Sequence, residues 1–216
     1  MDASAPIIST TLTPVVTLEQ DQRVLSVAGA SNVKSLAGSI AHTSRSAFPP
    51  KLQSVGPTSL NQAIKAIAVA RTFLEANELD LDVEVSRVAD AEIRNLIQLK
   101  LVKKTRQAPS SAPAGSGDDG QAAAVVDLRC AALTETVALA GAISNNVREG
   151  KQVRITAIGP LPVFRAVDAI IRARAFLARD GMDVLFSPQF TTIDASDEGG
   201  GVVNAVQLCV SSVPLA

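Results

Sequence analysis

Five polar side chains in the first half of the chain have the types and spacing of a phosphate-binding surface. Lys65 follows Asn61 by one helical turn, so both can face one partner, with Gln62 beside them. Lys34 and Ser59 lie where two helices are expected to begin, and free N–H groups and the helix dipole favour an anion there. The chemistry expected of this set is the binding of nucleic-acid phosphates.

A second basic group stands at the end of the same half, formed by Lys100, Lys103, Lys104 and Arg106. It closes the last expected strand and enters the segment that follows. Such a group could act as a mobile clamp on nucleic acid, in which each neutralised phosphate adds affinity that falls with salt.

Both groups have simpler interpretations. For any single lysine, the simplest is a solvated surface charge. Asn61, Gln62 and Lys65 together also fit a helix face that packs between paired domains, because the Ala-rich helix around them can approach a neighbour closely. The residues alone leave these alternatives open.

No residue pattern indicates catalysis or a metal site. His42 is the only histidine, without a cluster of Cys or carboxylates near it, and fits a surface or capping role. Asp80 and Asp82 alternate on one strand face but lack a basic or metal partner in the pattern. Cys130 and Cys209 lie in apolar runs and are expected to be buried thiols. We therefore predict a non-enzymatic protein with no catalytic residues, no metal and no cofactor.

The chain repeats itself with a constant shift of 103 positions. SLAGSIAHTSR at 35–45 is echoed by ALAGAISNNVR at 138–148. VGPTSLNQAIKAIAVARTFL at 55–74 is echoed by IGPLPVFRAVDAIIRARAFL at 158–177. The register holds without a gap through both pairs, so two copies of one small domain are expected.

Composition sets the domain boundaries. The run QAPSSAPAGSGDDGQAAA has no apolar period and is typical of a flexible linker. We predict a flexible N-terminal segment at 1–21, copy one at 22–106, a disordered linker at 107–123 and copy two at 124–216. The chain shows neither a secretion signal nor an apolar run near the roughly 20 residues that span a bilayer. We expect a cytoplasmic protein without membrane contact, the nucleus being the alternative compartment.

The pattern of each copy predicts a fold of the α/β class, and more narrowly an α+β two-layer sandwich. In copy one, alternating apolar residues predict a strand at 23–29, and Asn32 can cap a helix to about Arg45. A strand at 51–56 and a helix capped by Ser59 follow, then two further strands. The order is β-α-β-α-β-β, a two-layer sandwich with helices over a mixed sheet.

Charge is divided unequally between the copies. The whole chain has a net charge of −1, but residues 23–107 carry 12 Lys and Arg against 7 Asp and Glu. Residues 121–216 carry 8 against 9. Only 3% of the residues are aromatic, which disfavours base stacking as the mode of binding. Copy one is the half expected to contact nucleic acid.

The helix of copy one resembles the signature of the stage V sporulation protein S family, Ile-Gly-x-Gly-x-x-Asn-Gln-Ala-x-Lys-Ala-x-Ala-x-Ala-Arg. The family's second glycine is replaced here by Thr58. The matching residues are Gly56, Asn61, Gln62, Ala63, Lys65, Ala66, Ala68, Ala70 and Arg71.

Copy two resembles the other end of the family pattern. Its strand-hairpin-strand tail matches at Pro188, Phe190, Thr191 and Ile193, which copy one lacks. Its helix departs from the signature, with Phe164, Arg165 and Asp168 where the family has Asn, Gln and Lys.

The resemblance implies two tandem Alba-like domains, paired protomers, nucleic-acid binding and no catalytic activity. We expect the two copies to dock within the chain as a pseudo-dimer, replacing the homodimer of a single-domain relative, with higher oligomers or a larger assembly open. Backbone or shape recognition of RNA or DNA is expected rather than base reading. The alternative function is a structural or adaptor protein, favoured by the near-neutral charge and the few aromatics.

Overall fold

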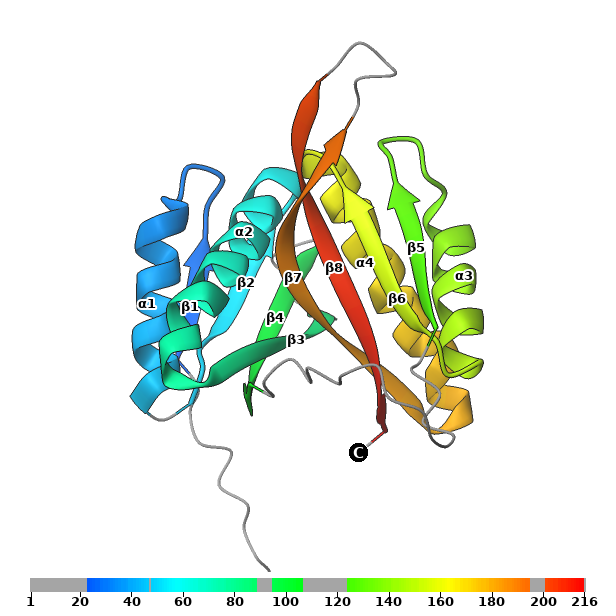
Figure 1. Ribbon diagram of the computed structural model, residues 1–216, viewed down its shortest axis with the longest axis horizontal. Coiled ribbons are helices and arrows are strands. Elements are labelled where there is room, and N and C mark those ends of the chain that lie inside the picture. The colour runs from blue at the N-terminus through cyan, green and yellow to red at the C-terminus, as the bar shows by residue number, and fades with distance from the viewer. Residues whose placement is uncertain (1–22, 47, 89–94, 107–123, 195–200, 216) are drawn as a thin grey trace, which may run out of the picture.

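The computed structural model describes residues 23–46, 48–88, 95–106, 124–194 and 201–215, without the side chain of Asp194. The flexible segment predicted at 1–21 and the linker predicted at 107–123 lie outside these ranges. Both copies have the predicted β-α-β-α-β-β order (Figure 1).

The elements of the two copies correspond almost one to one. Copy one consists of β1 (Val24–Val27), α1 (Val33–Ser46), β2 (Lys51–Val55), α2 (Pro57–Leu74), the 3-10 turn η1 (Glu75–Asn77), β3 (Leu79–Val88) and β4 (Leu96–Thr105). Copy two consists of β5 (Val125–Cys130), α3 (Thr136–Arg148), β6 (Gln152–Ala157), α4 (Pro160–Leu177), η2 (Ala178–Asp180), β7 (Met182–Asp194) and β8 (Val202–Pro214). The long helix and its 3-10 turn keep the shift of 103 positions found in the sequence.

One mixed sheet of eight strands runs through both copies, in the order β1-β2-β4-β3-β7-β8-β6-β5. The first two strands of each copy are parallel, and the other pairings are antiparallel. The helices form one layer, because α1 packs on α2, α2 on α4, and α4 on α3. In Figure 1 this places the helices of copy one on the left and those of copy two on the right.

Small aliphatic side chains fill the space between the helices and the sheet. The predicted stripe of α2 is fully buried: Leu60, Ile64, Ile67, Ala70 and Leu74. Phe186 is the largest side chain that is fully buried among the described residues. Because so few aromatic rings enter the core, the helices can lie close to the strands.

The predicted cap of α1 is confirmed, whereas that of α2 is wrong. The side chain of Asn32 accepts the N–H of Ser35 at 3.0 Å. Helix α2 begins two residues before Ser59, at Pro57, whose fixed φ suits the first turn. Gly56 makes the preceding bend with a φ of 84°, and the Ser59 hydroxyl donates to the carbonyl of Val55 at 2.6 Å.

The copies meet along a seam between β3 and β7. Val83 pairs with Phe186, and these are equivalent positions of the repeat, so a pseudo-twofold axis passes between them. The guanidinium of Arg71 binds Asp80 of its own copy and donates to the carbonyl of Pro188 at 2.6 Å.

Arg174 makes the equivalent contacts from the other side of the axis. It binds Asp183 of its own copy and donates to the carbonyl of Val85. Its guanidinium also pairs with Glu84 at 3.1 Å. Each copy therefore extends one arginine into the backbone of the other.

Replacing Arg71 by alanine is expected to lower the free energy of unfolding by about 3–5 kcal/mol, because Asp80 would stay buried with only Lys104, at 3.9 Å, as a cationic neighbour. Arg154→Ala is the control: it removes an exposed pair with Asp127 and is expected to cost at most about 1 kcal/mol. Urea unfolding of the full chain measures both. Equal losses in the two variants would contradict a dominant role for the seam.

Candidate nucleic-acid interface

Both helices of each copy begin at the same end of the sheet. Parallel strands finish at a common edge, and β1 and β2 lead into α1 and α2 there. We call this part of copy one its loop end, residues 28–34 and 55–59. The loop end of copy two comprises residues 131–137 and 158–162. Both lie toward the top of Figure 1.

The loop end of copy one carries an exposed lysine and an exposed threonine beside Val55, which is 50% exposed. Lys34 is exposed on the first turn of α1, and no carboxylate among the described residues pairs with it. Thr58 is exposed at the start of α2. Gln62 faces inward instead, where its amide donates to the carbonyl of Ser31 at 3.2 Å and holds the loop before α1. Arg165, at the equivalent position, holds Thr134 in the same way.

The structure separates Asn61 and Lys65 from that surface. Asn61 is 5% exposed, and its side-chain oxygen has no partner among the described residues. Lys65 is half-buried at the position equivalent to Asp168. Asp168 binds Arg87 across the seam and Arg172 on its own helix, so this position faces the other copy. The arrangement favours the second interpretation of this set, packing between domains, for Lys65.

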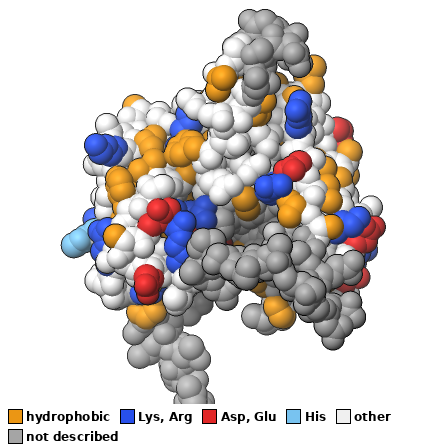
Figure 2. Space-filling view, in the orientation of Figure 1, with side chains coloured by type: hydrophobic (Ala, Val, Ile, Leu, Met, Phe, Trp, Pro, Cys, Tyr) orange, Lys and Arg blue, Asp and Glu red, His pale blue; other side chains and the backbone are white. Residues whose placement is uncertain are grey.

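Three members of the predicted clamp already have carboxylate partners within copy one. Lys100 pairs with Glu84 at 2.9 Å, Lys104 with Asp82 at 2.7 Å, and Arg106 with Glu75 at 2.8 Å. Lys103 is exposed beside them. Figure 2 shows basic and acidic side chains lying next to each other on this face. A phosphate would have to compete with these ion pairs.

Copy two presents apolar side chains at its loop end, a feature that the sequence reasoning missed. Leu133 is 93% exposed, and Val137, Ile158 and Leu161 are each more than 40% exposed. The repeat register contains the signal. Val137 and Leu161 stand at the positions of Lys34 and Thr58 in copy one.

The seam carboxylates are held in their charged forms. Burial raises the pKa of Asp80, but the hydrogen bonds and charge of Arg71 outweigh it, so the pKa lies below its ordinary value. The pKa of Asp183 is lowered in the same way, with Arg174 outweighing the effect of burial. These aspartates are components of ion pairs, which leaves neither as an acid–base catalyst.

The family model for stage V sporulation protein S matches residues 23–103 and 126–212, one match in each copy. The chain belongs to the stage V sporulation protein S family. The tandem duplication inferred from the repeat register is thereby confirmed. The family is not a known enzyme family.

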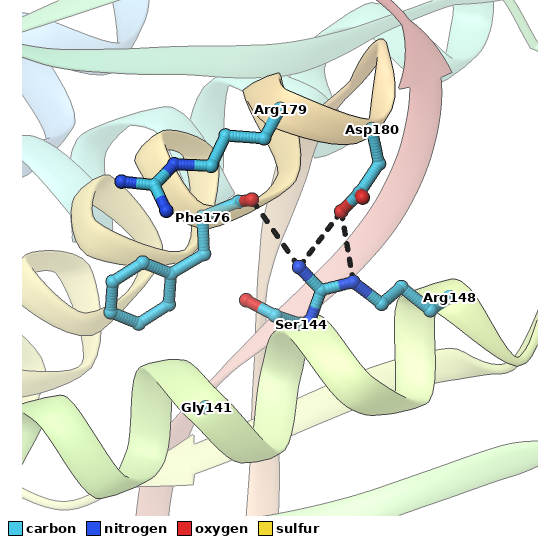
Figure 3. Close-up of a pocket in the computed structure, with 6 residues that line it drawn as sticks. All are labelled: Gly141, Ser144, Arg148, Phe176, Arg179 and Asp180. Atoms are coloured by element: carbon cyan, nitrogen blue, oxygen red, sulfur yellow. Dashed lines mark hydrogen bonds and ion pairs between the residues drawn. The ribbon is translucent and has the colours of Figure 1, made fainter.

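The second stage V sporulation protein S domain also contains a hollow of about 260 Å³ between α3 and the end of α4. Figure 3 shows the guanidinium of Arg148 lying between the carbonyl of Phe176 and the carboxylate of Asp180. In copy one, Arg45 bonds Asn77 and the carbonyl of Phe73 in the same place. The arrangement ties one helix to the next, so we assign it to the fold.

Other candidate chemistry is absent from the part of the chain that the structure describes. No group of three or more metal-binding side chains occurs there. Within the same ranges, no helix is long and apolar enough to cross a membrane. Cys130 is buried as expected and Cys209 is half-buried; both are free thiols, and burial raises the pKa of each. The nucleic-acid-binding roles expected from the sequence stay predictions for all nine residues: Lys34, Ser59, Asn61, Gln62, Lys65, Lys100, Lys103, Lys104 and Arg106.

The free energy of unfolding is expected to fall as the pH drops from about 5 toward 2. Burial raises the pKa of Asp168, but Arg87 and Arg172 outweigh it and hold the pKa below its ordinary value. A lowered native pKa stabilises the fold above the unfolded-state value of about 3.9, and this contribution is lost as pH falls through the native value.

Asp168→Asn is expected to flatten this dependence, measured by urea unfolding at several pH values. Asp127→Asn, which alters the exposed pair with Arg154, is the matched control. A profile that Asp168→Asn leaves unchanged would contradict the assignment.

Proposed function

We propose that this two-domain member of the stage V sporulation protein S family binds nucleic acid through the loop end of copy one, with copy two as its scaffold. The observation that carries the proposal is the difference between equivalent loop ends. Copy one exposes Lys34 and Thr58 where copy two exposes Val137 and Leu161. At these two positions the same backbone thus presents polar side chains in one copy and apolar side chains in the other, whereas Val55 and Ile158 are exposed in both.

Electrostatics supports the choice of copy one. The N-termini of α1 and α2 lie at one edge, and their free N–H groups and dipoles favour anions there. Residues 23–107 have an excess of Lys and Arg, whereas residues 121–216 do not. The sequence TTIDASDEGGG in copy two contains acidic residues and no basic one, and it would repel phosphates.

The type of contact follows from the residues available. Backbone N–H groups, a lysine and hydroxyls bind phosphates without distinguishing bases. The described part of this surface has no aromatic ring on which a base could stack. The proposal is therefore backbone recognition of RNA or DNA, and it requires no catalytic residue.

A second candidate function is protein assembly through copy two. Leu133, Val137, Ile158 and Leu161 come from two neighbouring loops and the helix starts after them. Exposed apolar side chains that gather in one region are typical of protein-binding surfaces. This function is compatible with nucleic-acid binding because the two surfaces belong to different copies.

Lys34→Val, which installs the residue of copy two, is expected to weaken binding of fluorescent RNA and DNA and to reduce the salt slope by about one phosphate contact. Titrations of the full chain at low and moderate salt measure both quantities. Lys100→Ala is the comparison variant and should have the smaller effect, because Glu84 already neutralises this lysine. Absence of binding at low salt would overturn the proposal. If Lys100→Ala weakened binding more than Lys34→Val, the result would favour the predicted basic clamp over the loop end.

Leu133→Ser tests the second candidate. If the apolar loop end joins two copies of the chain, sedimentation should show association that rises with concentration, and the variant should shift it toward the monomer. Ala30→Ser, the equivalent position of copy one, is the matched control. A monomer at every concentration would exclude self-association through this surface.

A further inference from the structure

A hollow of about 370 Å³ opens in copy one where β1 and β2 end and α2 begins. Its polar lining comes from Ser26, Gln53, Ser54 and Ser59, and Gly29 forms part of its wall. None of the described residues that line it is charged. Any ligand in it would therefore be held by neutral hydrogen-bond groups and by the helix dipole.

Ser54 provides the first sign of a ligand. Ser54 is one of the residues that line the hollow and is 2% exposed, and its hydroxyl has no hydrogen-bond partner among the described residues. A buried hydroxyl without a partner destabilises the native state, so such groups usually have a reason to be there. An acceptor placed in the hollow would satisfy this hydroxyl.

The start of α2 supplies further donors. The N–H groups of Thr58 and Ser59 have no acceptor within the helix, and no side chain caps them. The hydroxyl of Ser59 cannot do so, because it donates to the carbonyls of Val55 and Gly56. The first turn of this helix is open to an external acceptor.

Gly29 lies close to that first turn. A Cβ atom at this position would lie 3.1 Å from Cγ2 of Thr58 and 4.0 Å from the backbone nitrogen of Ser59. Any larger residue would thus extend over the free N–H of Ser59.

Copy two has lost each of these features at the equivalent positions. Ala132 occupies the position equivalent to Gly29, Ala157 that of Ser54, and Pro162 that of Ser59. The first alanine adds the methyl group, the second removes the hydroxyl, and the proline removes the N–H. The backbone of copy two thus follows the same order of elements without any of the three features.

We propose that this hollow is a binding site for a phosphate group, with the Ser54 hydroxyl and the N–H groups of Thr58 and Ser59 as donors. A tetrahedral oxyanion has several acceptor atoms for such converging donors, and a helix N-terminus favours its charge. The choice of phosphate rests on the function proposed above. The source is either a nucleic-acid phosphate or a free phosphate compound.

The test is a titration of the 15N-labelled full chain, first with inorganic phosphate at constant ionic strength, then with a short oligouridylate with or without a 5′-phosphate. The expected result is a saturable shift of the Thr58 and Ser59 amide signals. Ser54→Ala and Gly29→Ala should each weaken phosphate binding by about tenfold or more, since a hydrogen bond to a charged group is lost or obstructed.

Both substitutions install residues that copy two carries at these positions, and thermal unfolding verifies that each variant is folded. Ser212→Ala, on an exposed part of β8, is the matched control and should bind like the parent chain. Phosphate shifts that neither Ser54→Ala nor Gly29→Ala reduces would overturn the site, as would the absence of any shift at Thr58 and Ser59 with all three probes.

The titrations with phosphate and with the oligonucleotides distinguish a failure of the proposed phosphate site from a failure of the proposed nucleic-acid binding. Shifts with inorganic phosphate but none with either oligonucleotide support the site and overturn nucleic-acid binding. Shifts with both oligonucleotides indicate an internal backbone phosphate, whereas shifts only with the 5′-phosphorylated one indicate a terminal phosphate. Oligonucleotide binding that leaves Thr58 and Ser59 unshifted overturns the site and supports the function.

Discussion

The guanidinium groups of Arg71 and Arg174 make equivalent contacts from opposite sides of the seam. Each is largely buried, each binds an aspartate of its own copy, and each donates to a backbone carbonyl of the other. A buried guanidinium is stable only while these partners remain, so the fold of each copy depends on the presence of the other. Only one pair of residues joins β3 to β7 in the sheet. The two arginines therefore help to fix how the two halves are oriented, together with the Arg87–Asp168 ion pair and the packing of α2 on α4.

That fixed orientation gives the chain two equivalent ends with different chemistry. The loops and helix starts follow the same path in both copies, down to the positive φ of Gly56 and Gly159. On this shared backbone, copy one carries hydroxyls, a glycine and a lysine, and copy two carries leucine, valine and proline. These differences lie where strands end and helices begin, which is where α/β sheets commonly bind ligands.

The sequence predicted the repeat, the element order and the buried stripe of α2, because all three depend on periodicity and on register. It did not predict which basic residues would be neutralised. The partners of Lys100 and Lys104 lie on a neighbouring strand and become visible only through the pairing of β3 with β4. The start of α2 was misplaced because a glycine with positive φ and a proline began the helix before the expected serine cap. The hollow beside Ser54 was also invisible, since it requires the packing of a loop 25 positions earlier in the chain.

The pairing of Val83 with Phe186 on the pseudo-twofold axis has one further consequence. In an assembly of two identical chains, a residue on the axis must face its own copy, so only self-complementary pairs can stand there. Fusion removes that restriction, and a small side chain can lie against a large aromatic one. It also means that a substitution in this protein changes one side of the axis alone. Gene duplication has thereby turned a symmetric junction into one whose two sides can be altered independently.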